Sequence, residues 1–134
     1  MTRHVANPDW SRFKRATYSA AARVGDTWIL SGIGSTDPDG ELLHAGNLVE
    51  QTRQIYVNAS EILRVAGASM DAVVKTVDYI VPAAMDDYQL TRLVRLEFFS
   101  PPYPAATGVV VHSLLRKGML IEIEFWAAAE AAKR

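Results

Sequence analysis

Small or polar residues alternate with apolar ones in five short stretches of the chain, and a period of two is typical of β-strands. These stretches cover residues 16–24, 27–32, 74–81, 105–112 and 120–126. Gly25 and Asp26 separate the first two stretches and form a pair that is typical of hairpin turns. We therefore expect the first two strands to be antiparallel neighbours.

Two further segments carry apolar residues at the spacing of an amphipathic helix. The first follows Asn47, which together with Glu50 is close to a capping box, and it should end at Gly67. The second should begin at Asp86 or Asp87 and stop at residues 100–102. The predicted inward residues are Leu48, Ile55, Ala59, Ile62, Leu63 and Ala66 in the first helix and Leu90, Leu93, Val94 and Phe98 in the second. Each helix has one apolar stripe, so both should cover the same face of one sheet in an α+β fold.

The last two predicted strands place chemically different residues on their two faces, because side chains alternate along a strand. In the final strand Glu122 and Glu124 share one face, and Ile121, Ile123 and Phe125 share the other. A carboxylate repeated in an apolar strand forms either a solvated face or the wall of a pocket. In the preceding strand Ala106, Gly108, Val110 and His112 share one face.

Composition narrows the class of protein. The chain has 134 residues, of which 49% are hydrophobic, so we expect one domain over residues 1–134 with a polar N-terminal arm at residues 1–15. The net charge of −1 gives no reason to expect a nucleic-acid partner, and the absence of cysteine excludes disulfides and thiol chemistry. No apolar run approaches the length of a membrane span, so we expect a soluble, cytoplasmic protein without a membrane partner.

Several motifs in this order and at these separations resemble the RidA/YjgF family. They are Tyr18-Ser19 and residues 28–32, 50–54, 73–76, 97–99, 104–105 and 121–124. The resemblance implies a chorismate-mutase-like fold with a mixed six-stranded sheet and two helices on one face. It also implies a homotrimer with clefts between subunits. Founding members of the family hydrolyse reactive imines and enamines to keto acids and ammonia without a metal or an organic cofactor. The resemblance therefore implies that this chain needs neither.

The chain departs from the family at three positions of the cleft. Family deaminases carry an arginine directly after Pro-Ala that binds the substrate carboxylate, whereas this chain has Ala106. Gly108 stands where a cysteine is common, and Arg92 stands where the second helix often presents an asparagine. We expect a larger and less cationic pocket, which argues against imines derived from amino acids. Arg92 either restores a positive charge to the cleft or is a solvated arginine on a helix face.

The resemblance also assigns candidate catalytic residues. Glu122 matches the glutamate that positions water in the family cleft, and the alternative is a carboxylate that points outward from the strand. Tyr18, Ser31 and Gly32 match cleft positions that offer a phenol, a hydroxyl and backbone N–H groups for a developing oxyanion, although such residues are often simply packed. Ala106, Thr107, Gly108, Arg92 and His112 are the remaining ligand-binding candidates.

Other chemistries lack support in the sequence. His112 shares the strand face of Gly108 and titrates near neutrality, but a lone histidine at a strand end is more often structural. The three histidines have no metal-ligand spacing, so we expect no metal. Residues 32–34 are followed by a loop and not by a helix, which argues against a dinucleotide fingerprint. Ribonuclease activity, which is reported for some relatives, finds no basic aromatic groove here.

Two functions remain open. The first is a cofactor-free enzyme that hydrolyses or rearranges an imine, an enamine or a related carbonyl metabolite in a specialised pathway, with Glu122 as acid or base. Retention of Glu122, Tyr18 and Ser31 favours this function. The second is a non-catalytic trimer, either metabolite-binding or chaperone-like, and the loss of the family arginine at Ala106 favours it.

Overall fold

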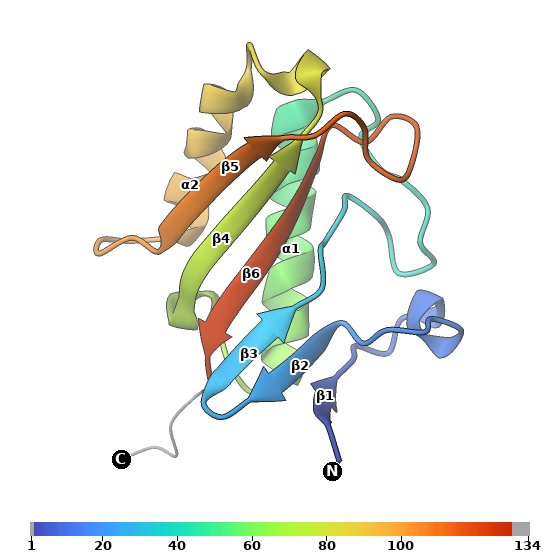
Figure 1. The fold of residues 1–134 in the computed structure, drawn as a ribbon, viewed down its shortest axis with the longest axis vertical. Helices are drawn as coiled ribbons and strands as arrows, with labels where there is room; N and C mark the ends of the chain where they lie inside the picture. The colour runs from blue at the N-terminus through green and yellow to red at the C-terminus, as the bar shows by residue number, and fades with distance from the viewer. Residues whose placement is uncertain (1, 130–134) are drawn as a thin grey trace.

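The protein is built on one mixed sheet of six strands. The computed structural model describes residues 2–129. Its strands lie in the order β1-β2-β3-β6-β4-β5, and β4 and β5 are the one parallel pair (Figure 1). The strands are β1 (His4–Ala6), β2 (Ala21–Val24), β3 (Thr27–Leu30), β4 (Val73–Ile80), β5 (Ala105–Val110) and β6 (Ile121–Ala128). The expected mixed six-stranded sheet is therefore confirmed.

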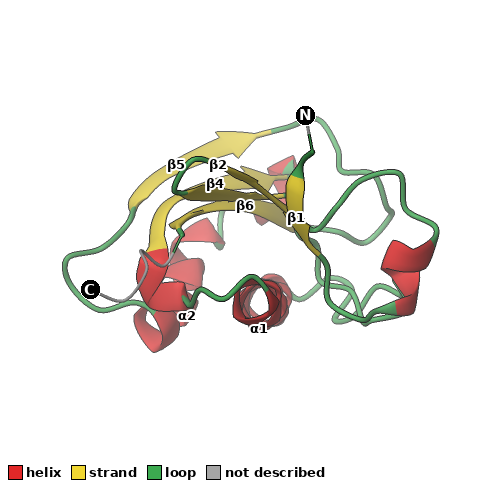
Figure 2. Cartoon of the chain, turned by 90° about the horizontal axis from the view of Figure 1, so that it is seen from below, coloured by secondary structure: helices red, strands yellow, loops and turns green. Residues whose placement is uncertain are grey.

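Both α-helices lie on the same face of this sheet (Figure 2). They are α1 (Leu48–Val65) and α2 (Arg92–Phe98), and short 3₁₀ turns η1 (Ser11–Lys14), η2 (Met70–Ala72), η3 (Pro82–Ala84) and η4 (Tyr88–Thr91) join the elements. No helix in the described part of the chain has the length and apolar character needed to cross a membrane. The arrangement confirms two helices over one face, and no helix from residues 2–129 covers the opposite face of the sheet.

The first helix has the ends and the apolar stripe that the sequence predicts. The Asn47 side chain accepts a hydrogen bond from the Glu50 N–H at 3.1 Å, and Gly67 follows the helix with a φ of +82°. An N-terminal cap of this kind satisfies a backbone donor that the helix leaves unpaired. Of the predicted inward residues, Leu48, Ile55, Ala59, Ile62 and Leu63 are buried.

The second helix differs from the prediction in its phase. Leu90 and Leu93 were expected to face inward, but their exposed fractions are 42% and 53%. Thr91 is buried instead, whereas Val94 is buried as predicted. The physical reason is the 3₁₀ turn η4 before α2, because three residues per turn rotate the inward face relative to a continuous α-helix.

The N-terminal arm forms more structure than its sequence pattern indicates. β1 pairs with β2 and supplies the sixth strand of the sheet, and the Asn7 side chain accepts a hydrogen bond from the Ala20 N–H at 2.7 Å. β2 begins at Ala21, so residues 16–20 lie outside the strand that was predicted for residues 16–24. The Gly25–Asp26 turn joins β2 to β3 as an antiparallel hairpin, as predicted.

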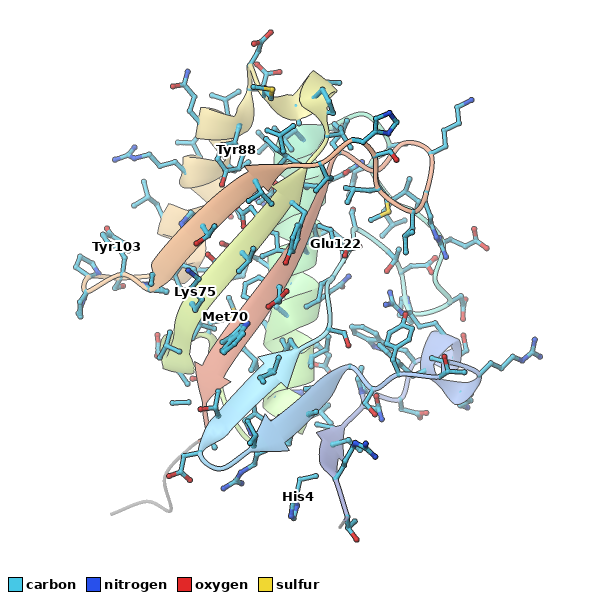
Figure 3. The ribbon with its side chains drawn as sticks, viewed as in Figure 1. His4, Met70, Lys75, Tyr88, Tyr103 and Glu122 are labelled. Atoms are coloured by element: carbon cyan, nitrogen blue, oxygen red, sulfur yellow. The ribbon has the colours of Figure 1, made fainter. Side chains whose placement is uncertain are left out.

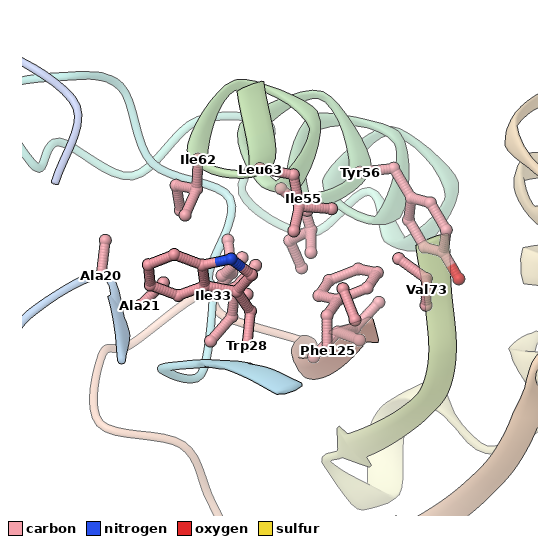
Figure 4. Packing of buried hydrophobic residues seen from close by; sticks show 14 of the residues in the cluster. Ala20, Ala21, Trp28, Ile33, Ile55, Tyr56, Ile62, Leu63, Val73 and Phe125 are labelled. Carbon is pink, nitrogen blue, oxygen red and sulfur yellow. The ribbon is translucent and has the colours of Figure 1, made fainter. Parts of the chain in front are cut away.

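The core lies between the sheet and α1 (Figure 4). The β6 side chains of Ile121, Ile123 and Phe125 are completely buried on the helical side. The Phe125 ring packs edge-on against the Tyr56 ring, with 5.2 Å between the ring centroids. Glu122 and Glu124 therefore point to the opposite, open face, as their alternation predicts. The consecutive strands β5 and β6 are not neighbours, because β4 lies between them.

Candidate functional site

A hollow of about 420 Å³ lies beside the central strand β6. Segments from distant parts of the sequence meet there: the N-terminal arm, the chain after β3, the loop before β6 and β6 itself. The residues with chemical potential in its lining are Arg12, Arg15, Tyr18, Gly32, Arg116 and Glu122. The structure thus brings together three of the predicted site residues, namely Tyr18, Gly32 and Glu122.

Glu122 occupies the hollow because residue 32 has no side chain. A Cβ atom on Gly32 would overlap the Glu122 Oε1 atom and would lie 3.0 Å from Cδ. Only glycine leaves the carboxyl this space, so the Ser31-Gly32 sequence that was predicted to donate backbone N–H groups also has a steric role. Figure 3 shows Glu122 on β6, near the centre of the sheet.

The electrostatic environment of Glu122 suits proton transfer. Partial burial raises the pKa of its carboxyl above the ordinary value, and the positive charge of Arg12 opposes that rise. Within residues 2–129, no donor forms a hydrogen bond to this carboxylate. A half-buried carboxyl with a raised pKa and free lone pairs can hold a water molecule and exchange a proton with it.

Glu124 shares the strand face of Glu122 but is held by its neighbours. Its two carboxylate oxygens accept hydrogen bonds from the Tyr79 hydroxyl at 3.0 Å and from the Trp126 Nε1–H at 2.7 Å. These contacts fix the carboxylate against the sheet. The two glutamates therefore differ in availability, although the sequence presents them identically.

Tyr18 and Ser31 lie close to the hollow but are differently engaged. Tyr18 is 55% exposed and also lines a second hollow, which includes Ser31. The Ser31 hydroxyl donates to the Ser19 carbonyl at 2.7 Å, and the Ser31 N–H donates to the Ala20 carbonyl at 2.9 Å. Both Ser31 donors are thus used in this structure, and its hydroxyl oxygen retains only acceptor capacity for a ligand.

The remaining candidates lie in a second group on β5 and α2. Ala106 and Gly108 face the helical side of the sheet, whereas Thr107 faces the open side and accepts a hydrogen bond from Lys75 Nζ at 2.7 Å. His112 is exposed just beyond β5, and Arg92 lines a separate hollow of about 280 Å³ together with Arg95, Leu96 and Tyr103. Because β4 separates β5 from β6, this group does not share a hollow with Glu122 inside one protomer.

The space beside Gly108 is not open, although the missing side chain suggests an enlarged pocket there. A Cβ atom on Gly108 would lie 2.9 Å from the Tyr88 hydroxyl oxygen, so a phenol already fills the adjacent space. The missing side chain at residue 108 therefore does not simply enlarge a cavity. The sequence pattern gave no signal for this, because Tyr88 precedes α2 and only the fold brings it to β5.

Sequence reasoning also missed the three arginines of the hollow. Arg12 and Arg15 belong to the N-terminal arm, to which no site role was assigned, and Arg116 lies in the loop before β6. The basic residues at positions 12–15 and the basic pair at positions 116–117 are the signals that could have indicated them. Among residues 2–129, no group of three or more histidine, aspartate or glutamate side chains is placed to hold a metal ion.

Comparison with known proteins agrees with this fold. The chain matches the family described as Endoribonuclease L-PSP over residues 11–129. It is 35% identical over 113 residues to a RutC family protein of Pyrococcus horikoshii, and the aligned region covers 84% of this chain and 87% of that protein. It is 34% identical over 107 residues to human 2-iminobutanoate/2-iminopropanoate deaminase, which covers 80% of this chain and 76% of the human protein.

A solved structure gives the same result. The crystal structure of RidA from an Antarctic Psychrobacter superposes with a TM-score of 0.82 at 31% identity and covers 94% of this chain and 99% of that one. Because the sequence match, the identities and the superposition each extend over most of the chain, this protein belongs to the RidA/YjgF family.

Proposed function

We propose that this protein is a small-molecule enzyme that needs no cofactor and hydrolyses or rearranges an imine, an enamine or a related carbonyl metabolite. The observation that carries the proposal is the Glu122 carboxyl, which is half-buried, has a raised pKa and has no competing hydrogen bond from residues 2–129. Similarity to the human 2-iminobutanoate/2-iminopropanoate deaminase supports the reaction class.

In hydrolysis, Glu122 acts first as a base and then as an acid. Water adds to the carbon of the protonated imine while the Glu122 carboxylate takes one of the water protons, which gives a carbinolamine. The Glu122 carboxyl then returns that proton to nitrogen, and ammonia leaves as the C=O bond forms. The hydroxyl proton released in the last step passes through Glu122 to solvent. A carboxyl with a raised pKa performs both transfers near neutral pH more readily than an ordinary one.

The proposed cleft requires more than one copy of the chain. Glu122 points to the open face of the sheet, whereas Ala106 and Gly108 lie two strands away and face the helical side. The open face also exposes apolar side chains such as Trp126, Val109 and Val24. A homotrimer in which β5 of one copy approaches Glu122 of the next would cover this face and complete the cleft. Native mass spectrometry should then detect three copies of the 14.8 kDa chain, and a monomer would contradict the shared cleft.

The lining of the hollow favours a substrate with an acidic group. Arg12, Arg15 and Arg116 provide three guanidinium groups, against the carboxylates of Asp39 and Glu122. Ala106 offers no guanidinium at the position of the family clamp. The positive charge thus comes from the arm and the loop before β6. The expectation drawn from Ala106, that imines derived from amino acids are poor substrates, therefore narrows to the short 2-imino acids, and a larger imine with an acidic side chain suits these charges better.

An imine panel tests the proposal. Amino-acid oxidases generate 2-iminopropanoate, 2-iminobutanoate and 2-iminoglutarate, and an amine oxidase generates neutral imines. Semicarbazide traps the imine that the enzyme has not hydrolysed, so a lower yield of the trapped product measures turnover. We expect little turnover of the two short imino acids and faster turnover of a larger, acidic imine. Glu122→Gln should lower kcat by about 100-fold or more, whereas Glu124→Gln, its neighbour on the same strand face, should keep most of the activity. Equal activity of Glu122→Gln and wild type would refute the assigned role.

The second candidate function is a non-catalytic trimer that binds a metabolite or acts as a chaperone. The observation in its favour is Ala106, which removes the family's substrate-binding arginine. This function predicts no turnover across the panel and ligand binding that Glu122→Gln leaves unchanged.

A further inference from the structure

Two buried polar side chains lie on β4, next to the edge strand β5 and outside the hollow that contains Glu122. Thr76 and Asp78 of β4 are the register partners of Ala106 and Gly108, so all four residues face the helical side of the sheet. Tyr88, which begins η4, places its hydroxyl beside Gly108. Figure 3 labels Tyr88 and Glu122 in different parts of the molecule.

Asp78 holds the Tyr88 hydroxyl in one orientation. The phenol donates a hydrogen bond to Asp78 Oδ2 at 2.6 Å, which is a short distance typical of a charge-assisted bond. Asp78 is only 4% exposed, and its Oδ1 atom has no partner among residues 2–129. Burial raises the pKa of Asp78, and the Tyr88 hydrogen bond and the Arg95 charge oppose that rise. Burial and the Asp78 carboxyl raise the pKa of Tyr88, so the phenol keeps its proton.

A buried carboxyl of this kind costs stability unless hydrogen bonds and opposite charges compensate for its desolvation. The surrounding layer supplies only partial compensation. The Arg95 guanidinium donates to the Tyr56 hydroxyl at 3.1 Å and to Thr76 Oγ1 at 3.0 Å, which leaves Asp78 Oδ1 unsatisfied. What the carboxyl does achieve is to direct the proton of Tyr88 inward.

We propose that Tyr88 is a specificity-determining residue that contacts the ligand at Gly108, with Asp78 as its positioning residue. Since the Tyr88 hydroxyl donates its only proton in the hydrogen bond to Asp78, the phenol oxygen presents only lone pairs to a ligand, and it accepts a hydrogen bond from an N–H or O–H group. The ligand class is therefore an enamine, a protonated imine or a related compound with a donor at this point. This inference deepens the proposed function and rests on it for the identity of the cleft.

Gly108 is essential to this arrangement. Any larger residue would place its Cβ atom 2.9 Å from the phenol oxygen, a separation that real Cβ atoms rarely show, so the phenol would have to move. The glycine and the tyrosine therefore act as a unit: the strand gives up a side chain, and η4 supplies a hydroxyl in its place.

A binding experiment tests the inference without depending on turnover. The probes are methyl 3-aminocrotonate, a stable enamine with N–H donors, and methyl 3-methoxycrotonate, which lacks them; NMR titration gives both dissociation constants. Wild type should bind the amino probe about fivefold to tenfold more tightly, the effect of one hydrogen bond. Tyr88→Phe should abolish this preference. A wild type without the preference, or a Tyr88→Phe variant that retains it, would overturn the proposal.

Controls separate the contact from a structural role. Tyr56→Phe removes another phenol of the same layer, but Tyr56 is 1% exposed and cannot meet a ligand, so this variant should retain the preference. Loss of the preference in Tyr56→Phe would indicate that general disturbance of the layer is the cause. If Tyr88→Phe unfolds because Asp78 loses its donor, Tyr88→Phe/Asp78→Asn gives the same readout with a neutral amide. Glu122→Gln should lower kcat by about 100-fold or more and retain the preference, so failure of the proposed reaction and failure of this inference give different results.

Discussion

Gly32→Ala should remove most of the Glu122-dependent activity while leaving the fold intact. The added Cβ atom would lie 3.0 Å from Glu122 Cδ and 3.3 Å from Cγ, besides overlapping Oε1. Carbon atoms in contact lie about 3.5–4.0 Å apart, so the carboxyl must move by about 0.5–1 Å. A displacement of about 1 Å in a catalytic group can lower kcat by about 100-fold. Gly32 is exposed and its φ is not positive, so alanine adds no backbone strain there.

The assay is steady-state turnover of the imine that wild type hydrolyses fastest, together with thermal unfolding. Gly25→Ala is the matched control: Gly25 has a φ of +55° and a Cβ atom there would meet nothing within 4 Å. This control should lose about 1 kcal/mol of stability, because alanine is strained in the left-handed region, and should keep full activity. The carboxyl ¹³C shift of Glu122 reports the displacement without any substrate. A Gly32→Ala variant with wild-type kcat and an unchanged Glu122 signal would refute the reasoning.

Two further outcomes follow from the same contacts. The raised pKa of Glu122 means that the folded state binds its proton more tightly than the unfolded state, so this group's stabilising contribution is full in acid and is lost as the pH rises through the folded pKa. Glu122→Gln should therefore unfold at a higher temperature than wild type at pH 7, and the difference in unfolding temperature should be smaller at pH 4. Calorimetry at both pH values checks this. The same difference at both pH values would contradict the reasoning. Gln51 is completely buried and bonds the His44 and Gly118 carbonyls and the Leu120 N–H, so Gln51→Leu should cost roughly 2–4 kcal/mol in urea unfolding because these groups lose their partner. A loss below about 0.5 kcal/mol would show that water replaces the amide.

Local patterns predicted most of the elements, because period and end signals depend on neighbours in the sequence. Asn47 and Gly67 marked both ends of α1, and alternation along β6 predicted that Glu122 would point away from Ile121 and Ile123. The prediction was wrong where a neighbouring element changed the phase. Leu90 and Leu93 are exposed because η4 is a 3₁₀ turn, and β1 was missed because a three-residue edge strand has no period of its own.

The same limit applies to the candidate site. Glu122 and Glu124 look identical in the sequence, yet Tyr79 and Trp126 hold the Glu124 carboxylate, whereas no donor within residues 2–129 bonds the Glu122 carboxylate. The sequence likewise presents Gly108 as a vacancy, although the fold fills the adjacent space with Tyr88. Such differences depend on residues that are far apart in the chain.

What the sequence alone determined was the family resemblance, the α+β class and the face of β6 that carries Glu122, since each follows from the order and period of residues. Only the tertiary structure decided what surrounds that carboxyl. Packing between distant segments brings the arginines of the arm into the same hollow as Glu122. It also places Gly32 against the carboxyl, where the missing side chain leaves room for it. Side-chain contacts of this kind depend on how the elements are arranged in three dimensions, and no local pattern contains that information.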